Sequence, residues 1–142
     1  MKVEVIIADD HPLAREGVRH ILERDPDINV LAEAANGVEL LSLLEKHKPR
    51  PDVALVDARM PQMDGVEATK RIRQFFPNVR VLILSAFEDR EAVFSAVEAG
   101  ARGYILKDRS ADQLIEAVRA VVGGEFVVDP QLVAGKLKQR AG

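Results

Sequence analysis

The stretch Val53–Gly65, which reads VALVDARMPQMDG, decides how the rest of the chain is organised. A short apolar run delivers one carboxylate, Asp57, to a point where Pro61 and Gly65 mark a turn of the backbone. An apolar run of this length, bounded by turn residues, is typical of a buried strand in a parallel sheet. An acid at the end of such a strand lies at the carboxyl edge of the sheet, where open α/β folds bind ligands. The function of the chain then depends on which other residues reach that edge.

Length and composition indicate one globular domain. The chain has 142 residues, of which 47% are hydrophobic and 30% are charged. Its net charge of -3 argues against nucleic-acid binding by this chain alone, because phosphate contacts require a basic face. The absence of cysteine excludes disulfides, thiolate metal sites and thiol nucleophiles. The sequence has no signal-peptide pattern. It also has no apolar stretch of the ~20 residues needed to span a membrane, so we expect a cytoplasmic protein.

Strand-like and helix-like segments alternate along the chain. The strand candidates are residues 3–8, 28–34, 53–57, 80–84 and 103–106. A stripe of apolar residues at helical spacing follows each of them; after the second strand it consists of Val38, Leu41 and Leu44, and Ser110 is a candidate N-cap for the last helix. Short connections between these segments predict an α/β fold with a doubly wound five-stranded parallel sheet and helices on both faces.

Five polar side chains stand at the predicted carboxyl ends of these strands: Asp9, Asp10, Asp57, Ser85 and Lys107. Parallel strands end at one edge, so we expect these side chains to converge. Clustered carboxylates repel one another unless a cation neutralises them, and oxygen ligands on loops suit Mg²⁺. The lysine and the hydroxyl would supply a positive charge and a donor for a dianionic group. A carboxylate in such a place can attack a phosphorus centre and become an acyl phosphate.

The order and spacing of these motifs resemble the receiver domain of two-component response regulators. The resemblance covers roughly residues 3–122 and is carried by Asp9-Asp10, Asp57, Met60-Pro61, Asp64-Gly65, Ser85-Ala86 and Tyr104-Ile105-Leu106-Lys107. The opening Asp-Asp-His-Pro and the segment Gly-Tyr-Ile-Leu-Lys-Asp are most similar to the subfamily whose receivers precede a helix-turn-helix DNA-binding domain. The resemblance implies the flavodoxin-like strand order 2-1-3-4-5 and a receiver over residues 1–123. Residues 124–142 would be a linker, or a helical tail beginning near Asp129-Pro130, towards an output domain that is absent here.

The same resemblance implies a role for each site residue. Asp57 would be the phospho-acceptor, taking a phosphoryl group from a partner histidine kinase. Mg²⁺ would be bound directly by Asp10, largely through water by Asp9, and also by Asp57 and the backbone carbonyl of Arg59. The chain would therefore be a phosphorylation switch and not a turnover enzyme.

Three further residues would respond to the phosphoryl group and change the surface of the domain. Lys107 would pair with one phosphoryl oxygen, and Ser85 would move to hydrogen-bond another. Tyr104 would turn inward as Ser85 moves, and so remodel the surface formed by the fourth helix, the fifth strand and the fifth helix. Homodimerisation through the first and fifth helices would also be consistent with the family.

The sequence departs from the family pattern in ways that affect these expectations. Asp108 follows Lys107 where the family usually has proline after a cis bond, so the geometry of that peptide stays open. The positions that influence hydrolysis, two residues beyond the acceptor and two beyond the switch hydroxyl, hold Arg59 and Phe87. Neither residue is a carboxylate or an amide, and we therefore predict slow loss of the phosphoryl group.

Other interpretations fit the residues less well. Asp9-Asp10 alone would cap a helix, and Asp57 alone would be an ordinary turn residue. An aspartate-nucleophile phosphatase of the haloacid dehalogenase type needs a second acid where Arg59 stands, and a dinucleotide-binding module needs a glycine-rich loop where Asp-Asp-His-Pro stands. A stand-alone receiver that acts through protein contacts remains open. The histidines show no ligand-like spacing, and we expect His11, His20 and His47 to be surface residues.

Overall fold

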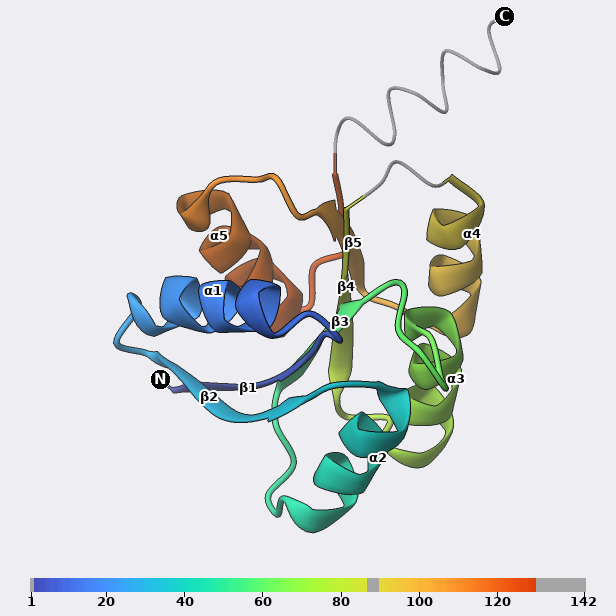
Figure 1. Ribbon diagram of the computed structural model, residues 1–142. Helices are drawn as coiled ribbons and strands as arrows, with labels where there is room; N and C mark the ends of the chain where they lie inside the picture. The colour runs from blue at the N-terminus through green and yellow to red at the C-terminus, as the bar shows by residue number, and fades with distance from the viewer. Residues whose placement is uncertain (1, 87–89, 130–142) are drawn as a thin grey trace, which may run out of the picture.

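The computed structural model describes residues 2–86 and 90–129. Its core is one parallel sheet with the strand order β2-β1-β3-β4-β5-β6 (Figure 1). The strands are β1 (Val3–Ala8), β2 (Ile28–Ala34), β3 (Val53–Asp57), β4 (Arg80–Ser85), β5 (Gly103–Leu106) and β6 (Val127–Val128). The helices are α1 (Pro12–Glu23), α2 (Gly37–Lys46), α3 (Gly65–Phe75), α4 (Arg90–Ala99) and α5 (Ala111–Val122).

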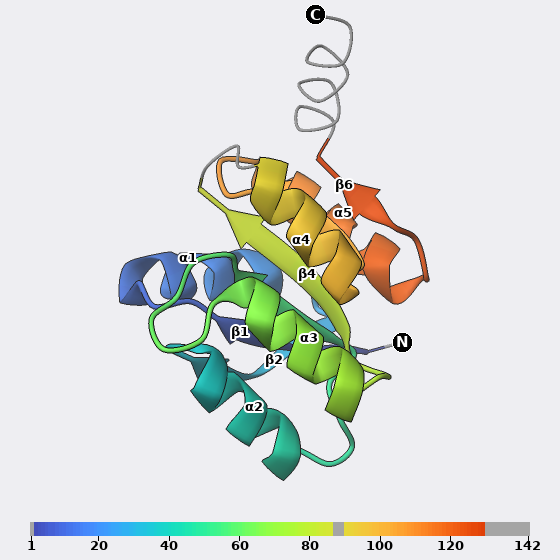
Figure 2. The ribbon, with the colours of Figure 1, turned by 90° about the vertical axis from the view of Figure 1, so that its right-hand side faces the viewer.

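Helices cover both faces of the sheet. Helices α1 and α5 lie on one face, and α2, α3 and α4 lie on the other, as the two views in Figures 1 and 2 show. Each face has its own apolar core: Leu22 of α1 and Val118 of α5 pack on one side, Leu44 of α2 and Ile72 of α3 on the other. Strand β3 is buried along its whole length, because both of its faces are covered. The predicted doubly wound α/β fold and its strand order are confirmed.

The sheet reverses its winding direction between β1 and β3. Strand β1 pairs with β2 on one side and with β3 on the other, both in parallel. The connections that leave β1 and β3 therefore diverge to opposite faces, which opens a crevice at the carboxyl ends of these two strands. Asp9 and Asp10 follow β1, and Asp57 ends β3, so the fold itself brings the two acidic motifs to this crevice.

A sixth strand lies within the segment expected to be a linker. Residues Val127–Val128 pair in parallel with β5, and Gly103 lies opposite Val127. A two-residue strand is too short to show an alternating pattern, so the sequence analysis predicted only five strands. Gly124, with a φ of 92°, reverses the chain after α5 and returns it to the free edge of β5. The helix predicted from Asp129 onward falls in residues 130–142 and so lies outside the described residues.

Two predictions about the helices can be compared with the structure, the N-cap of α5 and the apolar stripe of α2. Ser110 caps α5 through a capping box with Gln113, as predicted. The apolar stripe predicted for α2 was wrong at Val38, which is 49% exposed. Asn36 caps this helix by accepting a hydrogen bond from the backbone N–H of Glu39, and the buried face then carries Leu40 and Leu44, four residues apart.

Candidate functional site

Lys107 joins the acidic groups at the carboxyl edge of the sheet. Its Nζ lies 2.8 Å from Oδ2 of Asp9 and 3.2 Å from Oδ2 of Asp57. Burial raises the pKa of Asp57 above its ordinary value, and the charge of Asp9 acts in the same direction, while Lys107 opposes both. Burial also acts to raise the pKa of Asp9, but hydrogen bonds from Lys107 and from the backbone of His11 outweigh it and leave that pKa lowered. Asp57 is thus the carboxyl group of this pair that is less stabilised as an anion.

The turn after β1 is held by a network that starts at Asp9. The Oδ1 atom of Asp9 accepts a hydrogen bond of 2.9 Å from the backbone N–H of His11. Arg15 donates to the backbone carbonyl of Asp9 at 2.7 Å and to Oε1 of Glu33 at 2.9 Å. This network ties the turn to α1 and β2, so the two acids stand on a rigid support and not on a loose loop. In α1 the N-cap position belongs to His11, whose side chain makes no capping hydrogen bond.

Asp10 has an unsatisfied carboxylate oxygen. Its Oδ1 is buried and accepts no hydrogen bond from any residue that the structure describes. His11 Nδ1 lies 3.1 Å from this oxygen, a distance that suits an ion pair if the imidazole is protonated, although the contact lacks hydrogen-bond geometry. A buried carboxylate oxygen without a donor is costly unless a cation approaches it. The oxygen therefore fits a hard divalent cation such as Mg²⁺.

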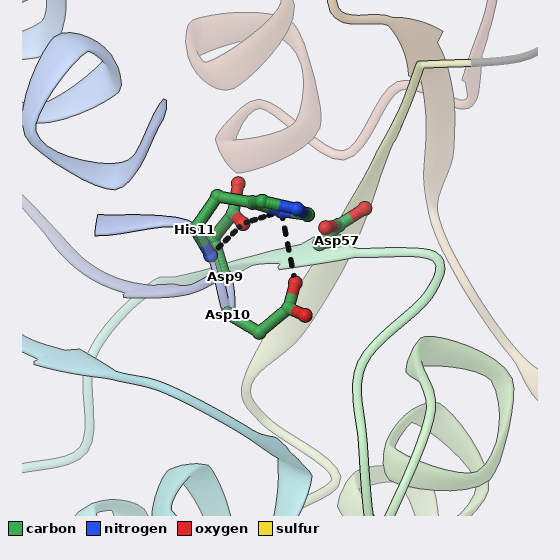
Figure 3. Close-up of side chains that lie close together, drawn as sticks. All are labelled: Asp9, Asp10, His11 and Asp57. Atoms are coloured by element: carbon green, nitrogen blue, oxygen red, sulfur yellow. Dashed lines mark hydrogen bonds and ion pairs between the residues drawn. The ribbon is translucent and has the colours of Figure 1, made fainter. Parts of the chain in front are cut away.

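Figure 3 shows the acidic cluster at the ends of β1 and β3. Asp9, Asp10, His11 and Asp57 each offer one ligand atom, and these atoms all lie within 4.8 Å of one another. The sequence pattern did not indicate a place for His11 in this cluster, and we expected it to be a surface residue. Its side chain is 70% exposed, as expected, but its ring is directed at both neighbouring acids. Sequence spacing cannot show this, because the direction of the ring depends on the turn.

Asp10, His11 and Asp57 of this cluster line an open hollow of about 360 Å³. Its lining also includes Met60, Pro61, Ser85, Ala86 and Lys107. Ser85 ends β4, is 3% exposed, and its carbonyl accepts a hydrogen bond of 2.8 Å from the N–H of Lys107. A larger hollow of about 780 Å³ lies at the start of β4, between α3 and α4, and no carboxylate lines it. The chemistry of the lining residues therefore identifies the smaller hollow as the candidate site.

Gly65 allows the loop after Asp57 to close against β3. The N–H of Gly65 donates to the carbonyl of Ala58 at 3.0 Å. A Cβ atom at this position would lie 2.5 Å from the carbonyl oxygen of Asp57 and 3.0 Å from the Cα of Ala58. Only glycine lets the first turn of α3 lie this close to the strand. Asp64, just before it, caps α3 by accepting a hydrogen bond from the N–H of Glu67.

The other residues predicted to belong to the site are Tyr104, Arg59 and Phe87. The Tyr104 side chain is fully buried in the core on the side of α2, α3 and α4. Arg59 is exposed and lines the hollow, and its backbone N–H donates to Oδ1 of Asp57 at 3.4 Å. Phe87 lies outside the described residues. Within the described parts of the chain the cis peptide bond is Lys48–Pro49, and the Lys107–Asp108 bond is trans.

These features define a doubly wound α/β domain with an acidic, lysine-bridged site at the switch point of its sheet. Among protein families, residues 5–119 match the response regulator receiver domain. The chain belongs to this family, as the resemblance of its motifs indicated.

Curated relatives and solved structures agree with this assignment. The chain is 41% identical over 138 residues to the transcriptional regulatory protein DegU of Brevibacillus brevis, covering 97% of this chain and 58% of that protein. It is 42% identical to the probable transcriptional regulatory protein NarL of Mycobacterium tuberculosis, covering 99% of this chain and 65% of that protein. The chain thus spans about three fifths of the length of these relatives.

Two solved structures are close in shape. The signal receiver domain of the putative response regulator NarL from Mycobacterium tuberculosis has a TM-score of 0.83 and 40% identity, over 87% of this chain and 98% of that one. A two-component response regulator of the LuxR family from Aurantimonas has a TM-score of 0.92 and 32% identity over the whole of both chains. No helix in the described residues is long and apolar enough to cross a membrane.

Proposed function

We propose that this domain is a signalling switch in which Asp57 accepts a phosphoryl group from a partner histidine kinase. The observation that carries the proposal is the position of Lys107, whose ammonium bridges Asp57 and Asp9 at the edge of the hollow. An oxygen of Asp57 attacks the phosphorus atom, the bond between phosphorus and the kinase histidine breaks, and the imidazole nitrogen leaves with its electron pair. The product is an acyl phosphate on Asp57.

The acids at the edge of the sheet would hold Mg²⁺. Asp10 would bind directly through its unsatisfied oxygen, Asp9 largely through water, and Asp57 and the carbonyl of Arg59 would complete the protein ligands. When bound, the ion supplies positive charge that stabilises the phosphoryl oxygens during transfer. Lys107 supplies a second positive charge 3.2 Å from Oδ2 of Asp57 and would pair with another phosphoryl oxygen.

The output of the switch would be a change of surface on α4, β5 and α5. Ser85 lines the hollow and would hydrogen-bond the phosphoryl group. Tyr104 lies on the strand next to Ser85, and Ile83, two residues before Ser85, pairs directly with it. A shift of Ser85 and of the end of β5 therefore alters the packing around Tyr104, which biases the domain between two states.

The longer relatives suggest where this output leads. Both curated relatives are named transcriptional regulators and continue beyond the region that they share with this chain. We propose that residues 1–123 form the receiver unit and residues 124–142 lead to a DNA-binding output domain, in a cytoplasmic protein that is able to form homodimers. A stand-alone receiver that acts through protein contacts is the alternative, and the reading frame downstream of residue 142 distinguishes the two.

Phosphorylation is tested by mass spectrometry of the intact chain after incubation with acetyl phosphate and Mg²⁺. We expect one phosphoryl adduct in the parent protein and none in Asp57→Ala. The matched control is Asp112→Ala, which removes an exposed acid from the first turn of α5 and should keep the adduct. No adduct on the parent, or an adduct that persists in Asp57→Ala, would refute the proposal. Omitting Mg²⁺ should slow formation of the adduct.

A further inference from the structure

Asp129 closes the edge of the sheet beside the candidate site. It follows β6, and its side chain is 1% exposed. The Asp129 N–H donates to the carbonyl of Tyr104 at 2.9 Å, which continues the ladder between β5 and β6. Its Oδ2 atom then accepts a hydrogen bond of 3.2 Å from the N–H of Leu106. The carboxylate thus takes the place that the next backbone carbonyl of β6 would occupy.

Arg109 holds this carboxylate from the other side. Its Nε and Nη2 atoms donate to the two oxygens of Asp129 at 2.6 Å each, in a bidentate pair. Arg109 stands in the turn between β5 and α5, and the capping box of Ser110 fixes the start of the helix directly after it. We call the arrangement of Arg109, Asp129 and the N–H of Leu106 the β5 clamp.

The β5 clamp acts on the backbone next to Lys107. The N–H groups of Leu106 and Lys107 point to opposite sides: that of Leu106 donates to Asp129, and that of Lys107 donates to the carbonyl of Ser85 in β4. The clamp therefore fixes one side of the peptide that leads into Lys107, while β4 fixes the other. Lys107 needs this support, because its Nζ reaches two carboxylates at the ends of two other strands, Asp9 after β1 and Asp57 in β3.

We propose that Asp129, held by Arg109, is a positioning residue for Lys107 and links the segment after α5 to the phosphorylation site. The proposal rests on the proposed function, since it concerns the lysine that would stabilise phosphoryl transfer to Asp57. Removing the carboxylate frees the N–H of Leu106 and loosens the end of β5, so the ammonium is placed less accurately. This coupling is reciprocal. If moving Lys107 out of its arrangement in the phosphorylated state weakens the clamp, then weakening the clamp disfavours that arrangement by the same free energy.

The first test compares initial rates of phosphorylation by acetyl phosphate with Mg²⁺. Asp129→Asn keeps the shape of the side chain and removes its charge, and we expect its rate to fall by about 5- to 20-fold. Arg109→Lys, which cannot make the bidentate pair, should lower the rate less. The control is Arg119→Gln, which breaks an exposed pair between Arg119 and Asp25 at the other end of α5 and should leave the rate unchanged. An unchanged rate in Asp129→Asn would overturn the proposal.

The second test separates positioning from a general loss of stability. In a Lys107→Ala background, followed over long incubations, Asp129→Asn should cause no further fall in rate, because it acts through the lysine. The same fractional fall in both backgrounds would show a merely structural effect and overturn the proposal. Amide hydrogen exchange gives a readout that does not depend on phosphorylation: the amides of Leu106 and Lys107 should exchange faster in Asp129→Asn. If the parent chain accepts no phosphoryl group but this exchange still changes, the proposed function fails while the clamp stands as a structural element.

Discussion

Substitution of Gly65 by alanine tests how closely the site loop is built against β3. The added Cβ would lie 2.5 Å from the Asp57 carbonyl oxygen and 3.0 Å from the Ala58 Cα, and both of these atoms belong to the backbone. No flexible side chain can move aside, so the first turn of α3 or the end of β3 must shift. Overpacking of this kind costs about 1–3 kcal/mol, and alanine recovers part of that through the unfolded state. We expect a net loss of about 2 kcal/mol.

Gly17→Ala is the matched control for this substitution. Gly17 also lies in a helix, α1, but nothing stands within 4 Å of the Cβ that alanine would add. This control should gain about 0.5–1 kcal/mol, because glycine is unfavourable inside a helix. Thermal unfolding followed by circular dichroism should therefore show a midpoint about 7 °C lower for Gly65→Ala and about 2–3 °C higher for Gly17→Ala.

The comparison of the two variants has a clear refuting result. A Gly65→Ala protein as stable as the parent would mean that the loop closes without the close approach, and the explanation for glycine at this position would be wrong. The substitution should also slow phosphorylation of Asp57, because the displaced carbonyl belongs to that residue. Gly17→Ala should leave the phosphorylation rate unchanged.

Three further outcomes are expected. Without Mg²⁺ at pH 7, Asp57→Asn should raise the unfolding free energy by about 1 kcal/mol. Burial raises the pKa of Asp57 and makes its anion unfavourable, and in the variant Lys107 still has Asp9 as an ion-pair partner. A lower midpoint of unfolding would contradict this. Glu33→Gln should cost at most about 1 kcal/mol at pH 7, since the hydrogen bond from Arg19 lowers the pKa of Glu33. This stabilisation is present above the unfolded pKa and is lost as pH falls through the lower folded pKa, so urea titrations should show a smaller difference in acid than at pH 7; a difference that does not shrink would contradict this. Without a phosphatase, the phosphorylated protein should keep its phosphoryl group for well beyond seconds, because Arg59 is neither an acid nor an amide. Mass spectra recorded over time measure the remaining phosphoprotein, and loss within seconds would disprove the prediction.

The sequence predicted the site because its residues follow strong patterns. Asp57 ends an apolar run before a turn, and Asp9 and Lys107 also end apolar runs. Once the strands are parallel, these ends must meet at one edge, so their proximity follows from topology alone. The contacts between side chains within the site could not be predicted from the sequence. That Lys107 lies closer to Asp9 than to Asp57 depends on side-chain packing that no periodicity records.

The β5 clamp shows a second limit of sequence patterns. Asp129 stands before a proline, a context that suggests a helix cap, and the apolar run Phe126-Val127-Val128 before it is too short to show the alternating pattern of a strand. Its role depends on Arg109, twenty residues earlier, and on the free edge of a strand only four residues long. A short strand exposes few backbone groups, so one carboxylate is enough to complete its ladder. Such a contact appears only when the edge of the sheet is known in three dimensions.

The charges at the site support the proposed roles of both a divalent cation and Lys107. When ionised, the three carboxylates of Asp9, Asp10 and Asp57 outweigh the single ammonium, which leaves two net negative charges at the edge of the sheet. A phosphoryl group on Asp57 would add further negative charge, and one buried oxygen of Asp10 accepts no hydrogen bond from the described residues. In the proposed switch a divalent cation would balance the carboxylates, and Lys107 would then be available to the phosphoryl oxygens. Because the β5 clamp holds the peptide that leads into Lys107, the segment after α5 would be part of the support on which the proposed charge balance depends.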